Sequence, residues 1–147
     1  MNREQHIEID APADTVWAVF SDVVRWPEWT ASVNRVVPID GPELVVGAQF
    51  AIEQPRLPKI VWEVIELDRG QTWKWRSTSV GTTTIAWHEV SPMDDGRTLV
   101  RQGIDQRGFL APLIGLLTAR VTERYLEMEA RGLKARSEQI HSDNGAT

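Results

Sequence analysis

Three kinds of side chain in this sequence could act on a small organic molecule: an imidazole, a phenol and several carboxamides. His88 lies in the middle of a segment with strand-like alternation, whereas the other two histidines lie close to the chain ends. A neutral imidazole can act as general acid or base near pH 7, and the phenol of Tyr125 can donate a hydrogen bond. His88 could equally be a hydrogen-bonded core residue or face solvent, and Tyr125 a packing residue, so catalytic and structural roles both stay open.

Other kinds of catalysis have little support in the residues. The three histidines are dispersed and there is no cysteine, so we expect no metal site and no disulfide. No glycine-rich phosphate loop and no nucleophile elbow is present. The formal net charge of −5 argues against a surface that binds nucleic acid or an anionic membrane. We therefore expect no metal, no cofactor and no nucleic-acid partner.

Tryptophan is over-represented, with seven in 147 residues. An indole brings a large apolar area and one N–H that needs a partner when buried. Smaller aliphatic side chains fill an ordinary core with better-defined rotamers. The excess indicates the walls of a wide apolar space, although indoles filling a strongly curved sheet remain the alternative.

The elements that position these side chains follow from hydrophobic periodicity and turn residues. Pro12 suits the start of a helix, and Ser21 and Asp22 can cap a second, shorter one that must end near Trp26, before a proline. Strands are predicted at residues 4–9, 33–39, 48–54, 59–67, 72–79, 82–90 and 98–107. A long helix is predicted over residues 112–139.

This long helix is amphipathic. One apolar face is predicted from the spacing of Ile114, Leu117, Val121, Tyr125 and Met128. Gly132 inside the helix costs roughly 1 kcal/mol relative to alanine. A close contact with another backbone would explain that glycine.

Alternation within the strands predicts which side chains point inward. Lys74 and Arg76 should face solvent, which turns Trp73 and Trp75 to the interior. In the strand over residues 82–90, Trp87 competes with His88 for the inner face. The other side chains expected on the inner face are Phe50, Ile52, Gln54, Trp62, Gln102 and Gln106.

Several short motifs carry a resemblance to a known family. They are Ile9–Ala13, Asp22–Trp29, Val46–Ala48, Val61–Leu67, His88–Pro92, Gly96–Thr98 and Glu129–Leu133. On these the chain resembles the START-like helix-grip (SRPBCC) superfamily, in its polyketide cyclase/dehydratase-like branch. The resemblance implies an α+β fold, in which a curved antiparallel sheet of about seven strands wraps round a long C-terminal helix, with two short helices after the first strand. It favours His88 rather than Trp87 on the inner face.

The resemblance also implies a cavity between sheet and helix. We expect it to bind a small hydrophobic molecule, aromatic or polyketide-like. A polyketide cyclase/dehydratase-type enzyme, with His88 or Tyr125 assisting, and a protein-interaction domain resembling chaperone activators are the alternatives. The expected ligand-binding residues are Phe50, Ile52, Gln54, Trp62, Trp73, Trp75, His88, Gln102, Gln106, Val121, Tyr125 and Trp29.

Two surface segments have two interpretations each. The segment Trp26–Trp29 either forms a rigid corner or provides an aromatic rim to the cavity. Arg56 either is a solvated loop residue or meets an anionic group at the mouth.

The organisation of the chain is simple. One domain over residues 1–140 is expected, with a flexible tail over residues 141–147. The N-terminus lacks the apolar stretch of a signal peptide, and no run approaches the ~20 apolar residues of a membrane span. We therefore expect a cytoplasmic monomer or homodimer.

Overall fold

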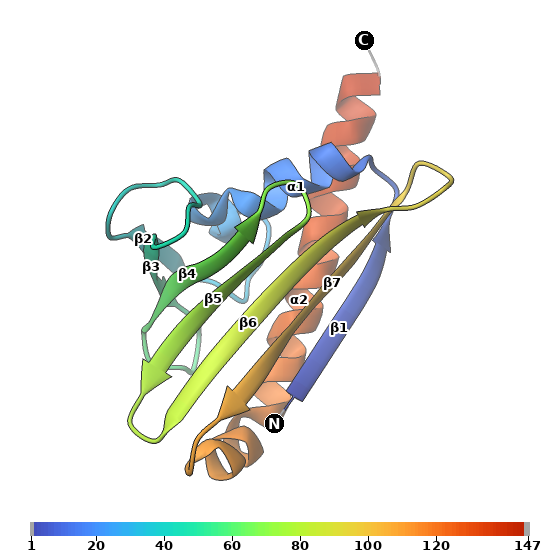
Figure 1. Ribbon diagram of the computed structural model, residues 1–147. Coiled ribbons are helices and arrows are strands. Elements are labelled where there is room, and N and C mark those ends of the chain that lie inside the picture. The colour runs from blue at the N-terminus through green and yellow to red at the C-terminus, as the bar shows by residue number, and fades with distance from the viewer. Residues whose placement is uncertain (1, 146–147) are drawn as a thin grey trace.

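A curved antiparallel sheet packs against one long helix in the computed structural model, which describes residues 2–145 (Figure 1). The strands are β1 (Asn2–Ile9), β2 (Arg35–Pro38), β3 (Gln49–Glu53), β4 (Ile60–Asp68), β5 (Thr72–Ser79), β6 (Thr82–Pro92) and β7 (Thr98–Arg107). The helices are α1 (Ala13–Ser21), the 3-10 helix η1 (Val23–Glu28) and α2 (Ala111–Gly145).

The seven strands form one sheet in the order β1-β7-β6-β5-β4-β3-β2. All neighbours are antiparallel, and from β2 to β7 each strand pairs with the next in sequence. The last strand, β7, pairs with the first, β1, so β1 and β2 are the edge strands of the sheet. α2 packs on β1 and β7, and α1 contacts α2 at one end (Figure 1). This is the α+β helix-grip arrangement that we predicted.

Alternation sorts the strand side chains as expected. In β5, Trp73 and Trp75 are buried whereas Lys74 and Arg76 are exposed. On the outer face Arg76 forms an ion pair with Glu63 of β4, with 3.6 Å between Nη2 and Oε2. The inner face of the sheet is thus apolar and aromatic, and the outer face carries charge.

Trp87 lies on the outer face of the sheet, as the resemblance implied. It pairs with Gly103 of β7, where an added Cβ would lie 2.7 Å from Cζ2 of Trp87. The indole therefore lies over the glycine, which leaves room for it and gives a half-buried tryptophan its cover.

The short second helix does not end near Trp26 as predicted. The 3-10 helix η1 runs on through Pro27 to Glu28. The backbone N–H groups of Trp29 and Thr30 both donate to the carbonyl oxygen of Trp26, so the last turn closes without the N–H that Pro27 lacks. The corner is held further by Trp26, whose Nε1 donates to the carbonyl oxygen of Phe20 at 2.9 Å.

Helix α2 is longer than predicted, and its inner face agrees with the prediction only in part: Ile114 and Tyr125 line the cavity. The helix continues to Gly145, so residues 141–145 of the expected tail are helical, while residues 146–147 lie outside the described part of the chain. Leu117, expected on the inner face, is 73% exposed. The row that faces the sheet contains threonines and a glutamate, which a pattern of apolar residues does not reveal. Within residues 2–145, no helix is both long and apolar enough to cross a bilayer.

The contact predicted for Gly132 is confirmed. A Cβ added to this glycine would lie 2.1 Å from the carbonyl oxygen of Trp29. Only a residue without a side chain allows the backbone of the segment after η1 to approach α2 this closely. The neighbouring Leu133 and Ala130 are buried in the same interface.

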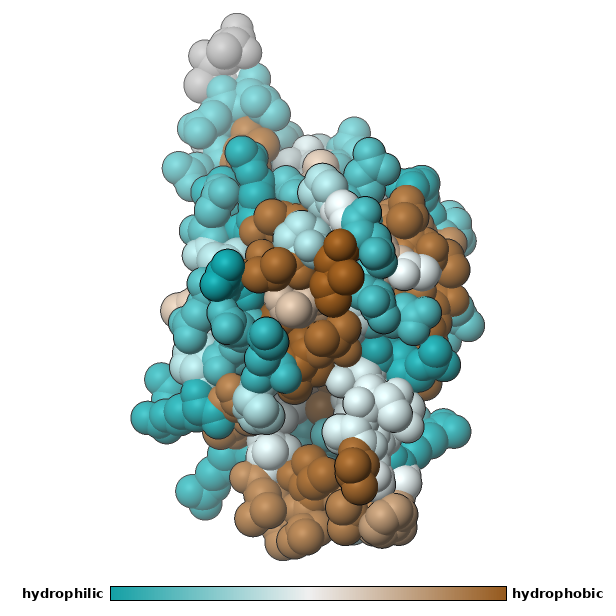
Figure 2. Space-filling view, turned by 90° about the vertical axis from the view of Figure 1, so that its left-hand side faces the viewer, coloured by the Kyte–Doolittle hydropathy of each residue, from teal (hydrophilic) through white to brown (hydrophobic). Residues whose placement is uncertain are grey.

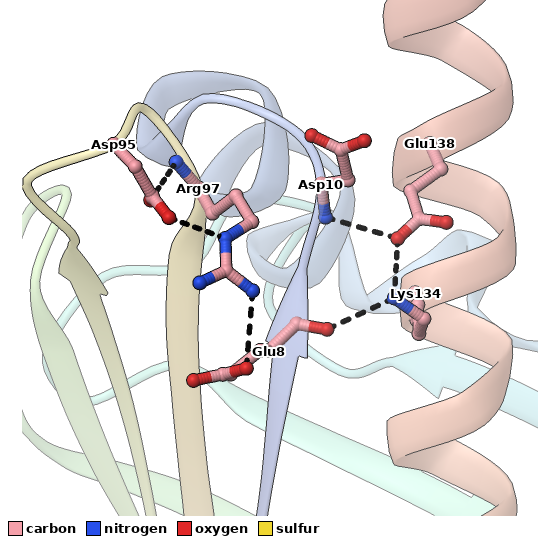
Figure 3. A network of polar contacts seen from close by, with 6 residues as sticks. All are labelled: Glu8, Asp10, Asp95, Arg97, Lys134 and Glu138. Carbon is pink, nitrogen blue, oxygen red and sulfur yellow. Dashed lines mark hydrogen bonds and ion pairs between the residues drawn. The ribbon is translucent and has the colours of Figure 1, made fainter.

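A polar network fastens the far end of α2 to the sheet (Figure 3). Lys134 donates from Nζ to the carbonyl oxygen of Glu8 at 3.0 Å and to Oε2 of Glu138 at 2.6 Å. Oε2 of Glu138 also accepts from the backbone N–H of Asp10 at 2.9 Å. Arg97, in the turn before β7, forms an ion pair with Glu8, with 3.1 Å between Nη1 and Oε2. These contacts fix the end of the molecule opposite the β5–β6 turn.

Candidate functional site

A cavity of about 730 Å³ lies between the inner face of the sheet and α2. Its walls come from every strand between β3 and β7, from the β3–β4 loop and from the first half of α2. Eight of the predicted site residues line it: Ile52, Gln54, Trp62, Trp75, His88, Gln102, Gln106 and Tyr125.

Four predicted site residues do not line this cavity. Trp73 is fully buried behind His88, with its ring against Phe20 and Trp17 of α1. Phe50 is also fully buried and packs on Trp75 at 6.2 Å between ring centroids. Val121 lies one position off the row of α2 that faces the cavity. Trp29 instead borders a smaller surface hollow of about 370 Å³ between α1 and the end of α2.

Three indoles form the aromatic wall of the cavity. Trp62 and Trp75 stack with their ring centroids 5.7 Å apart and an interplanar angle of 28°. Trp26, which we had placed in a structural corner or a rim, tilts against Trp75 at 5.6 Å and also lines the cavity. Each of the three rings therefore packs against another ring of the wall.

His88 is buried among aromatic rings at the inner end of the cavity. It is 4% exposed and stacks on Trp73 with 3.9 Å between ring centroids. Its Nδ1 lies 3.3 Å from the carbonyl oxygen of Trp73. Because a carbonyl oxygen only accepts, Nδ1 carries the proton and Nε2 is an acceptor. Burial lowers the pKa of His88 to about 3, against the effect of this hydrogen bond, so the ring is neutral at physiological pH.

Gln102 pairs with His88 across β6 and β7. Its Nε2 donates to the carbonyl oxygen of Leu126 in α2 at 3.0 Å. Its Oε1 is buried and has no hydrogen-bond partner within the protein, and Oγ1 of Thr82 is in the same state. Buried polar atoms are rarely left unpaired, so two groups in the cavity wall are suited to receive a polar group from a ligand.

Tyr125 closes one edge of the cavity instead of reaching freely into it. Its hydroxyl donates to the carbonyl oxygen of Pro55 in the β3–β4 loop. The next residue, Arg56, has a φ of 66°, is exposed and does not line the cavity. The structure therefore agrees with the packing interpretation of Tyr125 and with the solvated interpretation of Arg56.

Glu129 is the site residue that the sequence analysis missed. It lines the cavity from α2 and is 8% exposed. Oγ of Ser32 donates to Oε1 of Glu129 at 3.4 Å, and Ser32 in turn contacts Oγ1 of Thr30 at 2.8 Å. Burial raises the pKa of Glu129 to about 8, partly offset by the Ser32 hydrogen bond, so the carboxyl is protonated at neutral pH. One available signal was its spacing, four residues after Tyr125.

A neutral carboxylic acid differs from a carboxylate in what it offers a ligand. A protonated carboxyl has one O–H donor that a carboxylate lacks. Leu126, which holds Gln102, precedes Glu129 by three residues, about one helical turn. The cavity wall thus has a donor on α2, the protonated carboxyl of Glu129, and an unpaired acceptor on β7, Oε1 of Gln102.

The mouth of the cavity is marked by lining residues that solvent reaches. Pro58 and Lys59 of the β3–β4 loop and Thr78 and Ser79 at the end of β5 are exposed. Ile114 and Thr118, in the first turns of α2, also line the cavity and are partly exposed. Among residues 2–145, no group of three or more His, Cys, Asp or Glu side chains is placed to hold a metal ion.

Comparison with known proteins agrees with this geometry. Residues 2–138 match the family model for polyketide cyclase / dehydrase and lipid transport. No curated protein sequence matches the chain.

Solved structures share the fold at low sequence identity. The Zhui aromatase/cyclase from Streptomyces sp. R1128 is 17% identical, with 95% of this chain and 94% of that chain covered and a TM-score of 0.76. Norcoclaurine synthase from Thalictrum flavum is 14% identical, with 95% of each chain covered and a TM-score of 0.76. A START superfamily protein from Mycobacterium smegmatis is 17% identical, with 95% and 98% covered and a TM-score of 0.72. The chain belongs to the polyketide cyclase / dehydrase and lipid transport family.

Proposed function

We propose that the protein binds a small hydrophobic molecule, aromatic or polyketide-like, in the cavity between the sheet and α2. The observation that carries this proposal is the cavity itself, because about 730 Å³ is the size of a small-molecule site. Three indoles supply flat apolar walls suited to stacking against a planar ligand. The open interior favours ligand binding over the protein-interaction alternative, which needs no cavity.

The polar groups define the orientation of the ligand. A ligand carbonyl accepts from the protonated carboxyl of Glu129, while a ligand hydroxyl donates to Oε1 of Gln102. An uncharged ligand with oxygen at one end and an apolar body fits this arrangement. A carboxylate is disfavoured, because the described residues that line the cavity provide only one cation, Lys59, which lies at the exposed mouth.

Isothermal titration calorimetry with two probes of matched shape tests the proposal. 2-Acetylnaphthalene has a ketone, and 2-isopropylnaphthalene has the same outline without the oxygen. We expect both to bind and the ketone to bind more tightly.

A cavity-filling variant controls for binding elsewhere. Ala86 lines the cavity beside Trp75, its pairing partner on the adjacent strand, so Ala86→Phe should fill this space and abolish binding of both probes. Ala135→Phe adds the same ring at an exposed position of α2 and should leave binding unchanged. Binding of the probes that survives Ala86→Phe would refute the proposal.

An enzyme of the cyclase/dehydratase type is the second candidate function. The observation in its favour is Glu129, since a carboxyl protonated at neutral pH can give its proton to a carbonyl oxygen as an enol forms. The proton removed from carbon would have to pass to a base, and His88, with its pKa near 3, is a weak one. If the protein catalyses such a step, product formation from a reactive polyketone should fall in Glu129→Gln more than in His88→Gln.

A further inference from the structure

A group of large apolar side chains is exposed at one end of the molecule. Val80 is 86% exposed, Phe109 80%, Leu113 54%, and Leu116 and Leu117 73% each. Val80 lies in the β5–β6 turn, Phe109 precedes α2 and the leucines lie in its first turns. Figure 2 shows an apolar surface at the lower end of the molecule, where these elements meet. We call these five residues the apolar tip.

The apolar tip is one continuous surface. The backbone N–H of Leu110 donates to the carbonyl oxygen of Gly81 at 3.0 Å, which ties the start of α2 to the β5–β6 turn. A Cβ added to Gly81 would lie 2.9 Å from Cζ of Phe109, so this ring covers the turn beside Val80. Along α2, spacings of three and four residues place Leu113, Leu116 and Leu117 on one side of the helix.

The apolar tip borders the mouth of the cavity. Ser79, at the mouth, precedes Val80 directly. Ile114 and Thr118 line the cavity from the same turns of α2 that expose Leu113 and Leu117 to solvent. These turns therefore expose large apolar side chains on the side away from the cavity. A helix that only closed a cavity would have a polar outer side.

Cationic side chains follow the apolar tip along α2. Arg120 lies three and four residues after Leu117 and Leu116, and Arg124 lies one turn further; both are exposed. The acid between them, Glu123, forms an ion pair with Arg3 of β1. The net charge of −5 disfavours binding of the molecule as a whole to an anionic partner surface. This end of α2, however, has a local excess of positive charge.

We propose that the apolar tip inserts into the surface of an anionic lipid bilayer, with Arg120 and Arg124 at the level of the headgroups. Exposed apolar patches of this kind usually mark an interaction site. Arg120 lies one turn after Leu116 and Leu117, so its apolar stem can lie beside them while its guanidinium reaches the headgroups. Inserted this way, the cavity mouth faces the phase in which a hydrophobic ligand is dissolved.

A second copy of the chain fits this end less well. The apolar tip is the narrow lower end of the molecule in Figure 2, and two such convex ends would meet over a small area. A bilayer, in contrast, deforms around a convex apolar surface. The lipid surface is therefore the occupant that shape and charge both favour.

Co-sedimentation with vesicles tests the proposal without any cavity ligand. We expect the protein to bind vesicles of phosphatidylcholine with phosphatidylglycerol, and to bind pure phosphatidylcholine more weakly. The double variant Leu116→Glu/Leu117→Glu should lose binding to both. The matched control Val45→Glu/Val46→Glu adds the same charge to exposed valines of the β2–β3 loop, away from the tip, and should bind like the parent protein.

The electrostatic part has its own variant. Arg120→Glu/Arg124→Glu should weaken binding to the anionic vesicles by roughly tenfold or more, and bring it close to that on pure phosphatidylcholine. Thermal unfolding of each variant establishes that it is folded. The proposal is overturned if the parent protein stays in the supernatant with anionic vesicles. It is equally overturned if Leu116→Glu/Leu117→Glu and Arg120→Glu/Arg124→Glu both bind these vesicles as well as the parent protein does. It is also overturned if light scattering shows a parent dimer that Leu116→Glu/Leu117→Glu converts to monomer.

Discussion

The hydroxyl of Tyr125 in α2 donates a hydrogen bond to the carbonyl oxygen of Pro55 in the β3–β4 loop. This contact spans 70 residues of sequence and joins the two sides of the cavity at its edge. Pro58 and Lys59, which mark the mouth, follow a few residues later in the same loop. The contact therefore anchors one side of the opening to the helix.

Removing this anchor should change ligand exchange more than ligand affinity. In Tyr125→Phe the loop loses one hydrogen bond of about 1 kcal/mol, while the ring that packs in the cavity wall is retained. We expect the association and dissociation rates of 2-acetylnaphthalene to rise together by roughly fivefold. Stopped-flow measurement of tryptophan fluorescence gives both rates. Unchanged rates would mean that the loop does not limit access.

The contact of Gly132 with Trp29 should make this glycine essential for stability. Gly132→Ala places a Cβ against a backbone carbonyl, which a side-chain rotation cannot relieve. We expect a loss of about 1–3 kcal/mol in the free energy of unfolding, measured in urea. Gly145 lies in the same helix with nothing within 4 Å of an added Cβ. The control Gly145→Ala should change stability by less than about 0.5 kcal/mol, and equal effects of the two substitutions would contradict the packing argument.

Two buried titratable groups should give the stability opposite dependences on pH. The pKa of His88 falls from 6.5 to about 3 on folding, so the unfolded chain takes up this proton first and stability decreases as the pH drops below 6.5. The pKa of Glu129 rises from 4.5 to about 8, so stability decreases as the pH rises from 4.5 toward 8. Each slope reaches about 1.4 kcal/mol per pH unit, and the two oppose each other between pH 4.5 and 6.5.

Urea unfolding from pH 4 to pH 8 separates the two groups. Glu129→Gln should remove the loss of stability between about pH 6.5 and 8, where His88 no longer titrates. His88→Gln should instead expose the full Glu129 slope below pH 6.5. A decline above pH 6.5 that persists unchanged in Glu129→Gln would show that another group causes it.

Glu129 should also set the preference of the cavity for a ketone. Glu129→Gln keeps a donor in the form of the amide N–H, so 2-acetylnaphthalene should still bind more tightly than 2-isopropylnaphthalene. Glu129→Leu has no donor and should bind the two probes equally. A hydrogen bond to a neutral partner is worth about 1 kcal/mol, so the preference to be lost is roughly fivefold. A ketone preference that survives Glu129→Leu would place the donor elsewhere.

The strand pattern predicted most of the fold, because turn residues separate the strands and charge separates their faces. β5 and β7 begin and end where they were expected. Lys74 and Arg76 face solvent and Trp75 faces the interior, as alternation predicts. The same rule also turned Trp73 inward, but alternation predicts a face of the sheet and not a depth within it. Phe20 and Trp17 of α1 cover Trp73, and no pattern in β5 indicates where α1 lies.

The helix side of the site was harder to predict. A search for apolar residues favoured Leu117 and Val121, whereas the inner row of α2 contains Thr118, Thr122 and Glu129. Polar residues on that row face an open cavity instead of a packed core, so hydrophobicity does not reveal them. Two signals could have identified Glu129: it lies four residues after Tyr125, and it begins the motif Glu129–Leu133 that carries part of the family resemblance.

A hydrophobic ligand in the cavity between the sheet and α2 would lie against indole rings, and the seven indole N–H groups would report on it directly. Nitrogen-15 NMR of these groups, titrated with 2-acetylnaphthalene, compares indoles that line the cavity with indoles that do not. We predict large shifts for Trp26, Trp62 and Trp75, and none for Trp17, Trp29 and Trp87. Shifts confined to Trp29 or Trp87, or no shift at any indole at saturating probe, would contradict the account.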